Sequence, residues 1–352
     1  MSEIRIKRDE YTVILEEPEI YVDNEARKRS GHMTHAMAEF KPGCFIDFNS
    51  NCSPERCVGH STFGWLEYRI SKDAGKTFSP PIDLPLSTEY FYNGVFTISV
   101  EKATCCRDGK IVAFCLVNTL NGLTCCEPWQ EPLVITSTDE GKNWSAPKRM
   151  CNHKGRIYDA LTHKNDIYVL HFCNEQFIGK NPEDVYRLYK STDNAESFEE
   201  VSVIPFDTVG RAYGALLMDE SETLHAFAYN LNAESEMDHA ISRDFGATWE
   251  VLTPCHLEKG IRNPQVALVD GGYVLHGRAG DLNGFVFYTS PNAENWDKGT
   301  FVVEKKGAYA YYSNNINLED EKGKFLLVQY SDVYDDVARV NVWHMRVRVE
   351  RN

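Results

Sequence analysis

The octapeptide SKDAGKTF at Ser71–Phe78 decides the fold, because related octapeptides recur along the chain. The copies are STDEGKNW from Ser137, STDNAESF from Ser191, SRDFGATW from Ser242 and the shorter SPNAENW from Ser290. They start 66, 54, 51 and 48 residues apart. The copy from Ser191 has alanine at the glycine position, and the short copy from Ser290 has no glycine. Several copies at such spacing indicate a chain built from repeated structural units.

Each octapeptide has the chemistry of a tight turn. An Asp such as Asp73 accepts hydrogen bonds from backbone N–H groups just after it. Gly75, two positions on, adopts a positive φ without a Cβ clash. The final aromatic residue, here Phe78, returns to the core and anchors the turn. Each copy therefore predicts a hairpin turn between two strands.

A second repeat lies between these turns. Short strand-like runs begin at a glycine six times, at Gly31, Gly94, Gly155, Gly210, Gly260 and Gly307. A polar turn and a second apolar run follow each of them, and then a third strand that ends in the octapeptide. Four strands in about 50 residues form one blade of a β-propeller. The sequence therefore predicts an all-β, six-bladed propeller with four antiparallel strands in each blade.

The two ends of the chain complete this prediction. The sixth glycine-led run is followed by ARVNVWHMRVRV at 338–349, without an octapeptide after it. We expect the segment YTVILEE at 11–17 to supply the missing outer strand, which closes the ring and removes an exposed sheet edge. No helix of any length and no linker is expected, so residues 1–352 are predicted to form a single domain.

Composition limits the possible partners. The apolar fraction is 42%, which excludes disorder, and the net charge is −15, which disfavours nucleic acid. No apolar run approaches the roughly 18 residues of a membrane-spanning helix, and the N-terminus has no apolar leader, so we expect a cytoplasmic protein without a membrane partner. The 11 cysteines show no CxxC spacing, which favours reduced thiols. We expect no metal and no cofactor.

The octapeptide is similar to the Asp-box, or BNR repeat, and the chain resembles the sialidase (neuraminidase) superfamily of six-bladed propellers. The segment HGRAGDLNGF at 276–285 resembles the surroundings of a carboxylate-binding arginine of that family, at Arg278. The segment Tyr311-Tyr312-Ser313 resembles the family's nucleophile segment, with Tyr312 as the nucleophile.

Other positions depart from the family pattern. His32 lies where the resemblance places the first arginine, and the fourth blade has neither the expected glutamate nor the second arginine. For the acid/base the first blade offers Glu55 and, nearby, His60. The resemblance therefore implies the fold, and it implies an acidic sugar without specifying sialic acid.

The starts of the inner strands of a propeller converge on one face. The glycine-led runs should therefore gather cations, imidazoles and phenols that suit a carboxylate and proton transfer. We predict Tyr312, Glu55 and His32 as catalytic residues. The predicted substrate-binding residues are Arg278, Arg156, Arg211, Arg262, Tyr158, Asp159, Tyr213, Asn263 and Tyr309. Strand alternation adds His35 opposite His32, and directs Tyr311 away from Tyr312.

Each of these residues also has a structural interpretation. The arginines could form ion pairs between blades, the tyrosines could pack in the core, and either histidine could be structural. Three hypotheses for function follow. The first is a glycoside hydrolase of sialidase-like fold that acts on a small acidic saccharide. The second is a lyase that acts on a uronic acid, and the third is a non-catalytic glycan-binding propeller.

Overall fold

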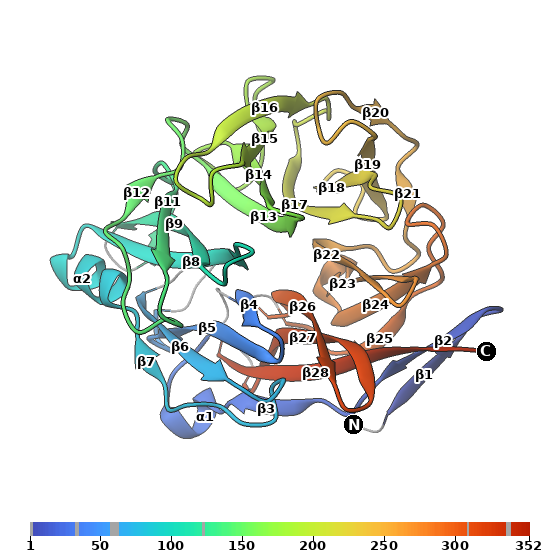
Figure 1. Cartoon of the computed structure of the whole chain (residues 1–352), viewed down its shortest axis with the longest axis horizontal. Coiled ribbons are helices and arrows are strands. Elements are labelled where there is room, and N and C mark those ends of the chain that lie inside the picture. Colours follow the sequence, from blue (N-terminus) through green and yellow to red (C-terminus); the bar gives the residue numbers. More distant parts are fainter. Residues whose placement is uncertain (1–2, 32–34, 57–62, 122–123, 308–309, 336–338) are drawn as a thin grey trace.

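A computed structural model describes residues 3–31, 35–56, 63–121, 124–307, 310–335 and 339–352. Six antiparallel sheets are arranged as a ring around a central axis (Figure 1). The predicted all-β, six-bladed propeller is confirmed.

The first three blades follow the expected order of strands, from the axis outward. Blade 1 contains β4 (Met37–Lys41), β5 (Cys44–Cys52), β6 (Gly64–Ser71) and β7 (Ile82–Asp83). Blade 2 contains β8 (Phe96–Cys105), β9 (Ile111–Asn121), β11 (Leu133–Ser137) and β12 (Lys148–Arg149), with β10 (Thr124–Cys126) on β9. Blade 3 contains β13 (Arg156–His163), β14 (Asp166–Cys173), β15 (Val185–Ser191) and β16 (Glu199–Ile204).

Blades 4 and 5 repeat this order. Blade 4 contains β17 (Arg211–Met218), β18 (Leu224–Asn230), β19 (Glu236–Ser242) and β20 (Glu250–Val251), with β21 (Cys255–His256) on β19. Blade 5 contains β22 (Arg262–Val269), β23 (Gly272–Arg278), β24 (Phe285–Ser290) and β25 (Thr300–Val303).

The sixth blade joins the two ends of the chain. It contains β26 (Ser313–Asp320), β27 (Gly323–Val333), β28 (Val340–Arg351), β2 (Tyr11–Leu15) and β1 (Ile4–Lys7), with β3 (Glu19–Val22) also on β28. In β2, Val13 pairs with Val349 and Leu15 with Val347, so the N-terminal segment supplies the outer strand as predicted. Figure 1 shows both termini at this blade.

Helices are few but present, so the expectation of no helix is wrong. α1 (Asn24–Arg27) is a single turn, η1 (Gly280–Leu282) is a 3₁₀ turn, and α2 (Pro85–Asn93) contacts β6 and β8. Pro85 begins α2 at a position where no N–H is needed, and Gly94 ends it with a φ of 74°. None of the helices that the structure describes is long and apolar enough to cross a membrane.

The octapeptide turns have the hydrogen bonds that their sequence predicts. Asp73 accepts from the backbone N of Thr77 at 2.9 Å and from its hydroxyl at 2.6 Å, while Ser71 accepts from Gly75 N at 2.8 Å. Gly75 has a φ of 82°. The same carboxylate contacts recur at Asp139, Asp193 and Asp244.

The aromatic residue of each turn reaches the preceding blade. The Trp144 ring, in blade 2, lies 5.8 Å from that of Phe48 in blade 1. The Phe198 ring, in blade 3, lies 5.5 Å from that of Phe114 in blade 2. Trp249 Nε1 of blade 4 donates to the Ser202 hydroxyl of blade 3 at 2.9 Å. The turns therefore connect neighbouring blades as well as consecutive strands.

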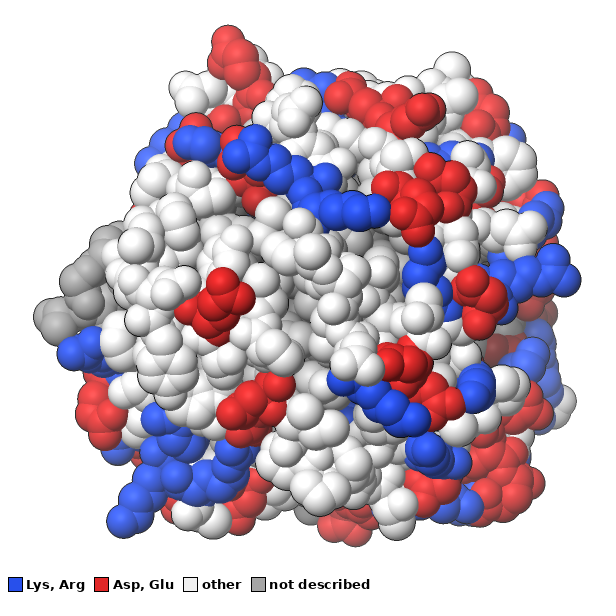
Figure 2. Space-filling model, turned by 60° about the vertical axis from the view of Figure 1, so that its left-hand side comes forward, with Lys and Arg blue, Asp and Glu red and all other residues white. Residues whose placement is uncertain are grey.

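The surface mixes charges of both signs. On the face that Figure 2 shows, lysine and arginine side chains alternate with acidic ones around a broad uncharged area, without one large basic patch. Large exposed apolar side chains are scattered, as at Ile82, Tyr92 and Val251.

We expect Val13→Asp to open the ring. Val13 is fully buried in the core of blade 6, so an unpaired carboxylate there should lower the free energy of unfolding by at least about 3 kcal/mol. Urea denaturation measures this loss. Lys7→Asp on the adjacent strand β1 is the control, because Lys7 is exposed. Equal loss in both variants would contradict a closure that depends on β2.

The octapeptide turns predict a loss of stability in acid. Hydrogen bonds from Ser197 and Thr248 lower the pKa of Asp193 and Asp244 to about 2, below the value of about 3.9 in an unfolded chain. This contribution is complete above about pH 4 and is lost as the pH falls towards about 2. In urea denaturation, the double variant Asp193→Asn/Asp244→Asn should lose less stability than the wild type between these pH values. An unchanged slope would contradict the assignment.

Candidate functional site

The inner strands form a closed cycle around the axis. β4 contacts β8, β8 contacts β13, β13 contacts β17, β17 contacts β22, β22 contacts β26 and β26 contacts β4. Their starts surround one mouth of the central channel and their ends surround the other. A cavity at the first mouth is lined by residues from all six of these strands or the segments before them, among them His35, Arg156, Tyr158, Tyr213, Asn263 and Tyr312.

Irregular pairing within the inner strands places these side chains. The register shifts between Val100 and Lys102 in β8, Ile157 and Asp159 in β13, Arg211 and Gly214 in β17, and Arg262 and Gln265 in β22. The residues inside these shifts include Glu101, Tyr158, Tyr213 and Asn263, and all four line the cavity. A β-bulge leaves an extra residue unpaired and redirects its side chain, which is how the four blades contribute to one cavity.

Two tyrosines meet in this cavity. The hydroxyls of Tyr213 and Tyr312 lie 3.1 Å apart, and the Arg278 guanidinium lies 5.1 Å from the centre of the Tyr312 ring. Burial, together with the neighbouring Tyr312, raises the pKa of Tyr213 well above 10. Tyr311 is fully buried and donates to the Lys305 carbonyl at 2.9 Å, so it serves the core while Tyr312 lines the cavity.

Arg156 is one of two buried cations that line the cavity, and Lys102 is the other. Arg156 Nε lies 2.6 Å from Glu101 Oε2, and its guanidinium lies 5.4 Å from the centre of the Tyr158 ring and 5.2 Å from that of Tyr213. Both charged side chains are less than 10% exposed. The Arg156 guanidinium at this cavity is therefore paired with a carboxylate, that of Glu101, on one side only.

Several polar atoms around the cavity have no hydrogen-bond partner among the described residues. They are Arg156 Nη1, the Tyr158 hydroxyl and both amide atoms of Asn263. The three residues are only 3%, 5% and 4% exposed. Buried polar groups without partners are uncommon, and several around one cavity suit a polar ligand.

Two of the predicted arginines point elsewhere. Arg211 Nε lies 2.6 Å from Asp238 Oδ2, and Arg262 Nε lies 3.0 Å from Glu234 Oε1. Neither is among the residues that line the cavity. Arg278 does not line it either, but its guanidinium lies over the ring of Tyr312, which does. The structure thus brings Arg156 and Arg278 to the tyrosine pair and places Arg211 and Arg262 in ion pairs with neighbouring carboxylates.

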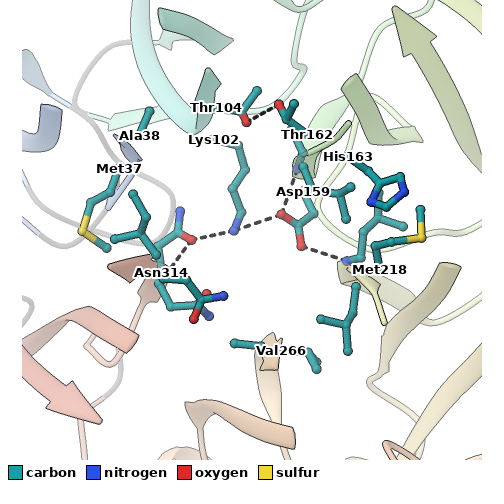
Figure 3. A pocket seen from close by; sticks show the side chains of 18 of the residues that line it. Met37, Ala38, Lys102, Thr104, Asp159, Thr162, His163, Met218, Val266 and Asn314 are labelled. Atoms are coloured by element: carbon teal, nitrogen blue, oxygen red, sulfur yellow. Dashed lines mark hydrogen bonds and ion pairs between the residues drawn. The ribbon is translucent and has the colours of Figure 1, made fainter. Parts of the chain in front are cut away.

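Asp159 belongs to a polar bridge across the channel. Lys102 Nζ lies 3.1 Å from Asp159 Oδ1 and 2.6 Å from each of the side-chain oxygens of Gln265 and Asn314. Figure 3 shows Lys102 between Asn314 and Asp159. Beyond this bridge lies a second cavity of about 510 Å³ at the ends of the inner strands, and Asp159 lines that one.

The remaining predicted catalytic residues lie apart from the tyrosines or outside the described residues. Glu55 is exposed and accepts a hydrogen bond from the Ser53 hydroxyl at 2.8 Å, which lowers its pKa. His32, His60 and Tyr309 fall outside the described residues.

The sequence analysis did not select Glu101 or Lys102. Both lie in the third quarter of an otherwise uncharged inner strand, and two adjacent opposite charges there were the available signal. The described residues contain no group of three histidine, cysteine, aspartate or glutamate side chains that could hold a metal ion. The cysteines at positions 44, 52, 105, 106, 115, 151, 173 and 255 are free thiols.

Comparisons with known proteins support the fold. No protein-family model and no curated protein sequence matches the chain. A solved protein of unknown function from Dyadobacter fermentans is similar with a TM-score of 0.73 and 14% identity, over 96% of this chain and 99% of that one. A variant of the NanB sialidase from Streptococcus pneumoniae matches with a TM-score of 0.64 and 10% identity, over 94% of this chain and 70% of that one.

A third similar structure is the intramolecular trans-sialidase from Ruminococcus gnavus in complex with oseltamivir carboxylate. Its TM-score is 0.64 at 11% identity, over 94% of this chain and 97% of that one. The chain is therefore a sialidase-like six-bladed propeller in fold.

The Arg156–Glu101 pair predicts strong coupling in stability. Arg156→Gln leaves a buried carboxylate unpaired and should lower the free energy of unfolding by about 3–5 kcal/mol. The double variant Arg156→Gln/Glu101→Gln should recover most of that loss, because neither charge remains. Urea denaturation of the two single variants and the double variant gives the coupling energy. Additive losses would contradict a direct ion pair.

Proposed function

We propose that the chain is a glycoside hydrolase that acts on a small carboxylated sugar at the cavity of Arg156, Tyr213 and Tyr312. One observation carries this proposal: buried polar atoms of Arg156, Tyr158 and Asn263 without partners surround the same cavity as the tyrosine pair. The sialidase-like fold supports it, since the similar solved enzymes are sialidases.

Arg156 and Arg278 have complementary roles in this proposal. Guanidinium groups bind carboxylates through paired charged hydrogen bonds, and burial strengthens such contacts. Arg156 holds Glu101 on one side and offers Nη1 on the other, and Arg278 lies over the Tyr312 ring. A carboxylated ring between them would have its anomeric carbon near Tyr312.

Tyr312 is the proposed nucleophile, or it stabilises the oxocarbenium-like transition state. Its partner Tyr213 is a phenol with a raised pKa, so at neutral pH it remains protonated and acts through its hydrogen bond. Asn263 and the Tyr158 hydroxyl supply donors for sugar hydroxyls. The buried surroundings exclude water from the reacting bond.

The same phenol pair favours a second candidate function, a lyase acting on a uronic acid. An arginine that neutralises the carboxylate makes the neighbouring C–H more acidic, and a basic side chain then removes that proton. The two reactions differ in mass balance. The products of a hydrolase sum to the substrate plus one water, and those of a lyase sum to the substrate alone.

The test is a screen of acidic and neutral glycosides, including uronides, followed by mass spectrometry of the products. Release with addition of water supports the hydrolase. Release without it, with a product that carries a new C=C bond, supports the lyase. Binding of acidic sugars without any product supports the glycan-binding propeller. Equal turnover of neutral and acidic glycosides would contradict the role proposed for the arginines.

With a substrate in hand, Tyr312→Phe should lower kcat at least about 100-fold with little change in KM, because the phenolic oxygen acts on the reacting carbon.

Arg278→Gln should raise KM about 10- to 100-fold through the lost charged hydrogen bond. Arg187→Gln is the control, since Arg187 pairs with Glu200 on β15 and β16, away from the cavity. Steady-state kinetics separate these effects, and a Tyr312→Phe enzyme of full activity refutes the assignment.

A further inference from the structure

Behind the cavity, Asp47 and Gln329 from two neighbouring blades form a chain of hydrogen bonds with His35, which is one of the residues that line the cavity. Asp47 on β5 is fully buried and accepts a hydrogen bond from Gln329 Nε2 on β27. The other end of the Gln329 amide, Oε1, lies 2.8 Å from His35 Nδ1. His35 lines the cavity and is 4% exposed. We propose that His35 transfers protons in this cavity, with its tautomer fixed by Gln329 and Asp47.

The tautomer follows from which atoms can donate. An ionised carboxylate only accepts, so Asp47 requires the amide nitrogen of Gln329 to face it. The amide oxygen then faces His35, and a carbonyl oxygen also only accepts. Nδ1 of His35 must therefore carry the hydrogen, and in the neutral ring Nε2 is the nitrogen with the basic lone pair.

His344 completes the chain on its far side. Its Nε2 lies 2.8 Å from Asp47 Oδ2, and its ring stacks on Tyr21 with centroids 3.9 Å apart. Burial raises the pKa of Asp47, while the contacts with His344 and Gln329 act in the opposite direction. The hydrogen bond that fixes the orientation of Gln329 is the one from its Nε2 to Asp47 Oδ1, which leaves the amide oxygen for His35.

The groups around His35 set its proton affinity. Arg156 and Lys102 line the same cavity and disfavour a charged imidazole, while Glu101 favours it. Asp47 and His344 lie behind Gln329, and the phenols of Tyr158, Tyr213 and Tyr312 face the cavity. An imidazole among opposing charges is suited to accept a proton and return it near neutral pH.

The role rests on the proposed hydrolase and balances in two steps. As the Tyr312 oxygen bonds to the anomeric carbon, its proton passes to His35 Nε2, directly or through a water. The glycosidic C–O bond breaks, and the departing oxygen takes that proton. A water then bonds to the anomeric carbon and gives its proton to His35, and Tyr312 recovers it on leaving. Throughout, Nδ1–H stays bonded to Gln329, so Gln329 and Asp47 are positioning residues.

The first test needs no substrate. In protein labelled with ¹⁵N-histidine, the ring signals that disappear in His35→Ala should show a protonated Nδ1 and an unprotonated Nε2 above about pH 8. In Gln329→Leu this preference should weaken, because the acceptor is gone. A wild-type His35 with its proton on Nε2 would overturn the inference whatever the substrate is.

The second test uses turnover. His35→Ala should lower kcat at least about 100-fold, with partial rescue by added imidazole, and Gln329→Leu should lower kcat and shift the pH profile with KM nearly unchanged. His239→Gln, a buried histidine of β19 that pairs with His225, is the control and should retain activity.

The two proposals fail in different ways. If the wild type turns over no acidic sugar, the hydrolase is refuted while the tautomer measurement still decides the geometry of His35. If turnover exists and His35→Ala keeps it, the proton-transfer role is refuted and the hydrolase stands. If His35→Ala does not fold, Gln329→Leu supplies the same decision through its tautomer and its pH profile.

Discussion

Closure of the ring is the constraint on which the rest of the structure depends. Six sheets remain a cycle only because the N-terminal strand β2 joins β28, which pairs in turn with β27 and β26. An open arc would leave a sheet edge exposed and would separate β26 from β4. The cavity needs both sides of that junction, since His35 precedes β4 and Tyr312 precedes β26. The same contact that stabilises the fold therefore assembles the site.

Buried charge distinguishes the channel from an ordinary hydrophobic core. Arg156 with Glu101, and Lys102 with Asp159, lose hydration on burial, and a well-packed apolar pair would be at least as stable. The two pairs differ in what they leave open. Lys102 finds three oxygens and is saturated, whereas Arg156 retains Nη1 without a partner among the described residues. Lys102, whose hydrogen-bonding capacity is filled, separates the two cavities. Arg156, which has a polar atom without such a partner, suits a ligand.

Much of the fold could be predicted from sequence, because it depends on local patterns. The turn at Asp73 is specified by residues within one octapeptide. The outer strand predicted at 11–17 follows from the sixth blade, which otherwise lacks an outer strand. The site could be predicted only in part. Tyr312 and Arg278 were predicted from segments with a recognisable order and Arg156 from its place at a strand start. The structure places Tyr312 and Arg156 at one cavity and Arg278 over the Tyr312 ring. The ion pairs of Arg211 with Asp238 and of Arg262 with Glu234 were not visible, because they join residues that only folding brings together.

The bulges explain why strand alternation misplaces residues at this site. Alternation alone sends Tyr158 and Asp159 to opposite faces, yet the register shift in β13 turns one towards each of the two cavities along the channel. The same device brings Glu101 into contact with Arg156 while Lys102, its neighbour, reaches Asp159. A propeller fixes the positions of six strand starts, and one unpaired residue in each of several strands then decides what those starts present. Two sialidase-like propellers that are about 10% identical can therefore share a backbone and offer different side chains to a sugar. The side chains of the cavity, and not the fold, then decide the chemistry.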